Sequence, residues 1–185
     1  MHMEKKEKFK KICKYVMYAV LLLFLVHVAT HFSYWKGIFD YWFKTDPGLM
    51  EVRVSYVIDG DTIIVKDEEN KELRVRLLGI DTPESTNCEE NACSEEGYAA
   101  AEYLSNLLEK NEKVYLEYDE RKYDQYGREL CYVWLSDNVD VHKYEDFEKY
   151  CVNALVLKNT YCKTLHYSPN NRYKDWLELI ETKKA

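Results

Sequence analysis

Hydrophobic and polar residues change their spacing several times along the chain, and each pattern predicts a different element. Residues 15–32 form an almost unbroken apolar run, within the length range of a membrane-spanning helix. From residue 51 onward, short apolar runs rich in β-branched residues are separated by turns, as in β-strands. Residues 95–110 carry an apolar stripe at helical spacing. We therefore expect an N-terminal apolar helix followed by an α+β domain at residues 51–182.

Five strands and three helices are predicted within this domain. Asp59-Gly60 lies between apolar runs and predicts a tight hairpin. Residues 73–80 form the third strand, in which Gly79 marks a bulge or kink. Residues 113–118 and 128–135 supply the last two strands, with a charged loop at 119–127 between them. The helices are expected at residues 95–110, 150–158 and 173–182, and the acidic residues 136–149 are expected to be an insertion.

Carboxylates stand at the ends of neighbouring predicted strands. Asp61 follows the first hairpin turn and Asp81 follows the third strand. Glu84 comes next, on a segment that Pro83 keeps out of the sheet because proline has no N–H to donate. Acids this close repel one another unless a cation neutralises them, and their hard oxygens suit Ca²⁺ or Mg²⁺. We predict a cluster of three acids around a cation; the alternative is that Asp61 and Asp81 serve only as turn and cap residues.

Four motifs follow one another in order over residues 52–171: Asp59-Gly-Asp-Thr62, Arg76, Asp81-Thr-Pro-Glu84 and Asp124-Gln-Tyr-Gly-Arg128. In these motifs and their spacing the chain resembles the staphylococcal nuclease family. The resemblance implies an α+β fold with a five-stranded OB-type β-barrel and about three helices. The open face and loops of such barrels bind nucleic acids and sugars.

The resemblance also implies a metal site and a group that handles the attacking water. Asp61 and Asp81 would supply carboxylate ligands to Ca²⁺, and Thr82 would supply its main-chain carbonyl. Glu84 corresponds to the family's proposed general base, and a role limited to positioning the water stays open.

The remaining implied residues bind the substrate. Arg76 and Arg128 match the two arginines that clamp the phosphate, since guanidinium groups pair with phosphate bidentately. Tyr126 and Tyr167 match tyrosines that line the nucleotide pocket, although packing in the protein interior is an equally open interpretation for both.

Two positions depart from the family pattern. Leu165 stands where the family commonly has a second pocket tyrosine, and Gln125 replaces the basic residue before the pocket tyrosine. Both changes remove nucleotide contacts without touching the metal ligands or the arginines. We therefore expect weaker nucleotide binding or an altered base preference, with the chemistry retained.

The net charge of the chain limits which nucleic-acid partners are expected. The net charge of −7 at pH 7 argues against a broad basic surface for duplex DNA. A nucleic acid would instead be bound at a focused site, and the resemblance implies DNA and RNA with unpaired strands favoured. The acidic residues in the loop at 85–94 would slow the approach of such a polyanion.

The N-terminal region predicts a single-pass membrane protein. Residues 1–14 are a lysine-rich flank, residues 15–32 the transmembrane anchor, and residues 33–50 an aromatic linker that could form a short helix on the membrane surface. Because basic flanks stay on the cytoplasmic side, we expect a cytoplasmic N-terminus and an extracytoplasmic domain. A cleaved signal peptide, which would give a secreted protein, and a buried helix of a soluble protein are the alternatives.

The cysteines fit no zinc-binding spacing. In an extracytoplasmic domain they would be exposed to oxidation, and Cys88 and Cys93 are the expected disulfide pair. Cys131, on a predicted strand, is expected in the core.

We interpret the chain as a membrane-anchored, Ca²⁺-dependent endonuclease that hydrolyses DNA and RNA with little sequence preference. One alternative is a catalytically inactive OB-fold module that binds nucleic acid or a protein at the membrane. A second is that the domain serves as a subunit of a membrane assembly. The simultaneous presence of Asp61, Arg76, Asp81, Glu84 and Arg128 favours the enzyme.

Overall fold

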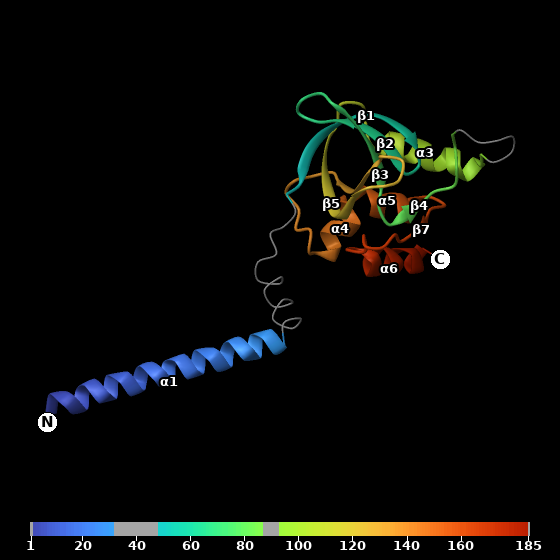
Figure 1. Ribbon diagram of the computed structural model, residues 1–185. Coiled ribbons are helices and arrows are strands. Elements are labelled where there is room, and N and C mark those ends of the chain that lie inside the picture. Colours follow the sequence, from blue (N-terminus) through green and yellow to red (C-terminus); the bar gives the residue numbers. More distant parts are fainter. Residues whose placement is uncertain (1, 32–47, 87–92, 185) are drawn as a thin grey trace. The chain divides into compact units, whose positions relative to one another are not determined.

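A computed structural model describes residues 2–31, 48–86 and 93–184. The chain divides into two compact units, Met1–Asp46 and Pro47–Ala185. In the first unit helix α1 spans His2–Thr30 (Figure 1). Within the described residues, no helix combines the length and the apolar character required to cross a membrane. The predicted anchor at residues 15–32 ends at Phe32, outside the described residues, and stays a prediction, as does the short helix expected in the linker.

The second unit is built on a closed five-stranded barrel with the strand order β1-β2-β3-β6-β5 (Figure 1). Its strands are β1 (Met50–Asp59), β2 (Thr62–Lys66), β3 (Glu72–Leu77), β5 (Lys113–Tyr123) and β6 (Glu129–Trp134). Neighbouring strands are antiparallel except β3 and β6, which run parallel. The predicted five-stranded barrel is therefore confirmed.

Two predicted turns place the acids of the candidate site. Asp59 pairs with Thr62 across the β1–β2 hairpin, so the Asp59-Gly60 prediction is confirmed. The third strand ends at Leu77, earlier than predicted, because the chain turns at Gly79, whose φ of +77° lies in the left-handed region. Beyond this turn β4 (Ile80–Asp81) leaves the barrel and pairs with β7 (Lys163–Thr164).

The barrel unit contains four helices among the described residues, α3 (Glu95–Leu107), α4 (Tyr144–Tyr150), α5 (Val152–Asn159) and α6 (Lys174–Lys184), so the prediction of about three was too low. Helix α3 packs against β1, whereas α5 packs against β6, α4 and α6 (Figure 1). Helix α3 begins at an N-cap, Ser94, whose hydroxyl accepts from the Gly97 N–H at 3.0 Å.

The additional helix lies where an acidic insertion was expected. Residues 144–150 form α4 because Phe147 is completely buried and stacks among aromatic rings, including Tyr173 at a centroid distance of 4.5 Å. The helix predicted at 150–158 is α5, which begins two residues later than expected because Cys151 has an extended backbone that pairs with Trp134. The high density of charged residues in this segment obscured the apolar residues that anchor it: Phe147 is buried, and Tyr144 and Tyr150 pack against the core.

The structure describes two of the cysteines for which a state was predicted, Cys93 and Cys131. Cys93 is disulfide-bonded, and its predicted partner, Cys88, lies outside the described residues. Cys131 is a free thiol buried in the core.

Candidate active site

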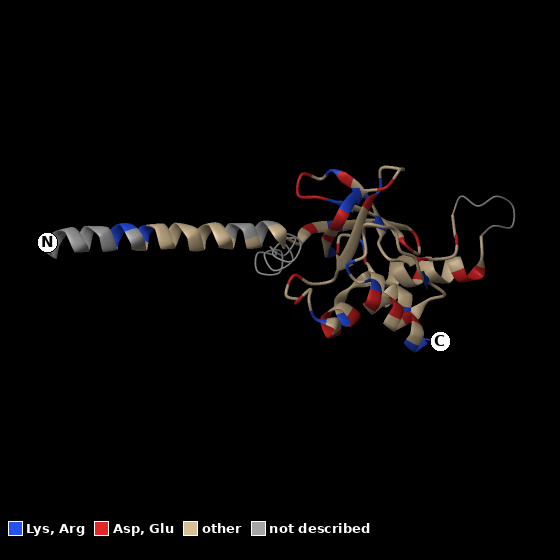
Figure 2. Ribbon diagram, turned by 60° about the horizontal axis from the view of Figure 1, so that its bottom comes forward, with Lys and Arg blue, Asp and Glu red and all other residues tan. Residues whose placement is uncertain are grey.

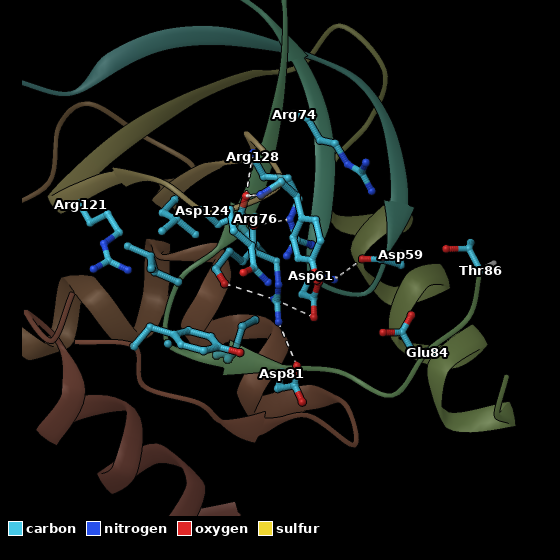
Figure 3. A pocket seen from close by; sticks show the side chains of 18 residues that line it. Asp59, Asp61, Arg74, Arg76, Asp81, Glu84, Thr86, Arg121, Asp124 and Arg128 are labelled. Atoms are coloured by element: carbon cyan, nitrogen blue, oxygen red, sulfur yellow. Dashed lines mark hydrogen bonds and ion pairs between the residues drawn. The ribbon is translucent and has the colours of Figure 1, made fainter. Parts of the chain in front are cut away.

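A pocket of about 870 Å³ opens where the β1–β2 turn, the end of β3, β4 and the β5–β6 hairpin meet. Most of the residues singled out in the sequence line it: Asp61, Arg76, Asp81, Glu84, Tyr126, Arg128 and Tyr167. Figure 3 shows Arg76 at its centre, with Arg128 above it and Asp61 and Asp81 below. Thr82, the remaining residue of the predicted set, is buried beside Asp61. The fold thus gathers residues that are more than a hundred positions apart in the sequence.

Arg76 joins the two aspartates. It lies on β3, and its guanidinium group contacts Asp61 at 2.7 Å (Nη1–Oδ2) and Asp81 at 2.9 Å (Nη2–Oδ1). Nη1 also donates to the main-chain carbonyl of Leu77 at 3.3 Å. Both partners of the Arg76–Asp61 pair are buried, whereas the Asp81 side chain is half exposed. Solvent therefore screens the contact with Asp81 more strongly than the contact with Asp61.

Asp61 is the most tightly held carboxylate of the site. Its side chain accepts hydrogen bonds from the Thr82 N–H at 3.2 Å, from the Thr82 hydroxyl at 3.1 Å and from the Thr62 hydroxyl at 3.0 Å. Burial raises the pKa of Asp61 to about 6, although the nearby Arg76 guanidinium opposes this shift. Asp59 adds a like charge nearby and raises the pKa further. A cation at this carboxylate would favour its ionised form.

The oxygen atoms of the two aspartates therefore suit a hard cation, but Glu84 does not join them as predicted. Two carboxylates converge on a single positive group, and carboxylate oxygens bind Ca²⁺; Thr82 contacts Asp61 through its N–H and its hydroxyl. Across the part of the chain that the structure describes, however, no three His, Cys, Asp or Glu side chains are grouped closely enough to hold a metal ion. The expectation that Glu84 completes a cluster of three acids was wrong, because the segment after β4 carries it away toward α3.

Arg128 reaches the pocket from the hairpin between β5 and β6. Asp124, four residues earlier, accepts from the Arg128 Nε at 2.7 Å and from the Arg128 N–H at 2.9 Å. Burial works to raise the pKa of Asp124, but these hydrogen bonds outweigh it and hold that pKa below its usual value. Asp124 therefore stays charged and fixes the guanidinium group that faces the pocket.

The two predicted pocket tyrosines are not core residues. Tyr126 is 73% exposed and Tyr167 is 56% exposed, and both line the pocket. The Arg128 guanidinium lies over the Tyr126 ring, 5.6 Å from its centroid. Interior packing is therefore excluded for both rings, and both expose ring surface to a ligand, although Arg128 lies over one face of Tyr126. Of the two departing positions, Gln125 lines the pocket, whereas Leu165 lies beside the Gly79 turn, where its N–H donates to the Gly79 carbonyl at 3.0 Å.

Glu84 is exposed at the edge of the pocket and is positioned by its own backbone. Its carbonyl accepts from the Ser94 N–H at 3.1 Å. A Cβ atom added to Gly97 would lie only 2.2 Å from that carbonyl oxygen. The exit segment and α3 can approach this closely only because residue 97 lacks a side chain.

Two further arginines line the pocket. Arg74, a residue of β3, is exposed and faces the pocket together with Arg121. The alternation of β3 would have revealed Arg74, because residues two apart on a strand point to the same side. No sequence signal marks Arg121, which lies in the segment predicted to be a loop and belongs to β5. Elsewhere acidic and basic residues are interspersed over the barrel unit (Figure 2).

Comparisons with known proteins point to one family. A profile of the family described as staphylococcal nuclease homologue matches residues 74–185. The thermonuclease of Staphylococcus intermedius is 35% identical over 168 residues, which cover 89% of this chain and 90% of the relative. The thermonuclease of Staphylococcus hyicus is 36% identical over 126 residues, covering 68% of this chain and 66% of the relative. Endonuclease YhcR of Bacillus subtilis is 27% identical over 133 residues, covering 70% of this chain but 10% of that protein.

Proposed function

Since the chain belongs to the staphylococcal nuclease family, whose relatives include named thermonucleases and an endonuclease, we propose that it is a Ca²⁺-dependent endonuclease acting on DNA and RNA. The observation that carries the proposal is the convergence of Arg76, Arg128, Asp61, Asp81 and Glu84 on one pocket. A phosphodiesterase needs positive groups for the phosphate and a group that handles water. This pocket contains both.

The two arginines are proposed to bind the scissile phosphate. Arg128 is oriented by Asp124, and Arg76 by its two aspartates. A guanidinium group has five N–H donors, so Arg76 can keep both aspartates and still contact a phosphate oxygen. Guanidinium groups carry a permanent positive charge in proteins, and such groups can stabilise the negative charge that grows in the transition state.

Glu84 is proposed to orient the attacking water or to accept its proton. Its carboxylate is exposed at the pocket edge, where water reaches it, and its main chain is held by Ser94. Asp61, Asp81 and the Thr82 carbonyl are proposed to hold the cation. When bound, Ca²⁺ at such a site would add positive charge next to the phosphate.

Tyr126 and Tyr167 are proposed to stack against bases. Both rings are exposed in the same pocket. Stacking of a base on an aromatic ring requires an unpaired base but depends little on which base it is. This supports a preference for single strands over duplexes.

The test uses the full-length protein and follows the release of acid-soluble nucleotides from denatured DNA and from RNA, in Ca²⁺ and in chelator. We expect calcium-dependent release that falls about 10²–10⁴-fold in Glu84→Gln and at least as far in Arg76→Ala. Arg53→Ala is the matched control, because Arg53 is an exposed arginine bonded to the Asn111 carbonyl outside the pocket. A folded wild-type protein that releases nothing in Ca²⁺ would instead identify an inactive binding module.

We further propose that residues 15–32 anchor the protein in the cell membrane, with the N-terminus cytoplasmic and the nuclease domain outside. In support, the large apolar side chains of α1 from Tyr15 to Phe24 are exposed, and they follow the exposed lysines 10, 11 and 14. Membrane fractionation and protease accessibility of the domain in intact cells test this arrangement. Recovery of the intact chain in the soluble fraction would refute the anchor, and recovery of a shortened chain outside the cell would indicate a cleaved signal peptide.

A further inference from the structure

Two arginines of the pocket have no part in the proposed chemistry. Arg74 and Arg121 both line the pocket and both are exposed. In Figure 3 they lie on opposite sides of the pocket, with Arg76 and Arg128 between them. The four arginines therefore extend across the whole opening and not only around its centre.

The pocket arginines differ in how their charges are used. Arg76 is paired with Asp61 and Asp81, and Arg128 with Asp124. Among the described residues, neither Arg74 nor Arg121 forms an ion pair with any carboxylate, although acidic residues line the same pocket. Their guanidinium groups are thus available to an anion that enters from solvent.

Backbone hydrogen bonds hold the main chain at both Arg74 and Arg121. Asn170, only 2% exposed, accepts from the Arg121 N–H at 2.7 Å and donates to the Arg121 carbonyl at 2.9 Å. The Asn170 N–H also donates to the Tyr167 carbonyl at 2.8 Å, so one buried side chain ties Arg121 to the loop that carries a pocket tyrosine. Arg74 pairs with Ile64 within the sheet and shares a strand face with Arg76.

We propose that Arg74 and Arg121 are additional phosphate-binding residues, which contact phosphates of the strand beyond the one held by Arg76 and Arg128. This inference deepens the proposed function and rests on it for the identity of the ligand. Exposed guanidinium groups beside a phosphate clamp would contact the phosphates on either side of the bound one. Gln125 replaces a basic residue of the family pattern, and Arg121, on the same hairpin, would supply the positive charge that is missing there.

The test measures binding, separately from hydrolysis. Anisotropy of a labelled single-stranded thymidine oligonucleotide is followed with full-length protein in chelator, from about 50 to about 200 mM salt, and the oligonucleotide is recovered afterwards to show that it is intact. Each phosphate contact with a single strand contributes about 0.7 to the slope of log K against log salt. We expect Arg74→Gln and Arg121→Gln each to reduce the slope by about that amount and the double variant by about twice as much.

Two controls separate this role from a general effect of charge. Arg121→Lys keeps the charge and should restore most of the slope. Arg53→Gln removes an exposed arginine outside the pocket and should leave the slope at its wild-type value. The inference is overturned if the wild-type protein does not bind the strand, if the pocket variants keep the wild-type slope, or if Arg53→Gln reduces the slope equally. Reduced slopes without hydrolysis in Ca²⁺ would refute the proposed function alone, and hydrolysis with unchanged slopes would refute this inference alone.

Discussion

Replacing Gly97 by alanine gives a sharp test of how Glu84 is positioned. Helix propensity alone predicts that this change stabilises α3 by roughly 1 kcal/mol. The structure predicts the opposite, because the new Cβ would lie 2.2 Å from the Glu84 carbonyl oxygen and 2.7 Å from the Pro83 carbonyl oxygen. Ordinary van der Waals contact begins near 3.4 Å, so the segment carrying Glu84 must move by roughly 1 Å. A displacement of about 1 Å in a catalytic group can cost about 10²-fold in rate.

The assay compares kcat/KM on denatured DNA for the wild type, Gly97→Ala, Glu84→Gln and the double variant. If the clash acts through Glu84, the double variant should be no slower than Glu84→Gln alone, since coupled residues are not additive. Tyr98→Ala, an exposed change at the next position of α3, is the control and should retain wild-type activity. The reasoning is refuted if folded Gly97→Ala keeps full activity, or if the two losses multiply in the double variant.

Three further changes test the interactions beneath the site. Arg76→Met leaves buried Asp61 without its partner at 2.7 Å, and urea unfolding in chelator should show a loss of about 3–5 kcal/mol, part of which Asp61→Asn should recover in the same chain. Burial raises the pKa of Glu117 above its usual 4.5, so the folded state holds this proton more tightly than the unfolded state does. The unfolding free energy, followed by the thermal midpoint, should therefore fall as the pH rises from 4.5 through the raised pKa. The Glu117→Gln variant has no such proton to lose, and its thermal midpoint should lack this fall. Asn153→Leu removes a buried side chain that donates to the Leu78 carbonyl at 2.8 Å and accepts from the Val133 N–H at 3.0 Å, and the denaturant midpoint should reveal a loss of at least about 2 kcal/mol; a smaller loss would show that water replaces these bonds.

The hydrogen bonds around Glu117 illustrate a feature that no local pattern predicts. This completely buried carboxylate accepts from the Trp134 indole N–H at 2.7 Å, from the Tyr173 hydroxyl at 3.0 Å and from Arg172 at 2.5 Å. In the sequence Glu117 is one of many charged residues in an alternating strand. Its role depends on partners up to 56 positions away, which only the folded chain brings together.

The sequence by itself determined those features that are local. The Asp59-Gly60 hairpin, the kink at Gly79 and the strand character of the barrel follow from backbone preferences of a few neighbouring residues. The motif residues could be assigned to one pocket because their order and spacing resemble those of a known family. A barrel with that strand order then places the end of β3 beside the β5–β6 hairpin.

Only the tertiary structure decided the features that depend on distant contacts. Residues 144–150 fold as α4 because Phe147 reaches an aromatic cluster built partly from the C-terminal segment. Glu84 stands apart from the aspartates because α3 approaches its main chain at Gly97. Arg121 enters the pocket because Asn170, 49 residues later, holds its backbone. Burial and long-range hydrogen bonds override local preference at each of these places, and they do so only once the chain has closed into the barrel.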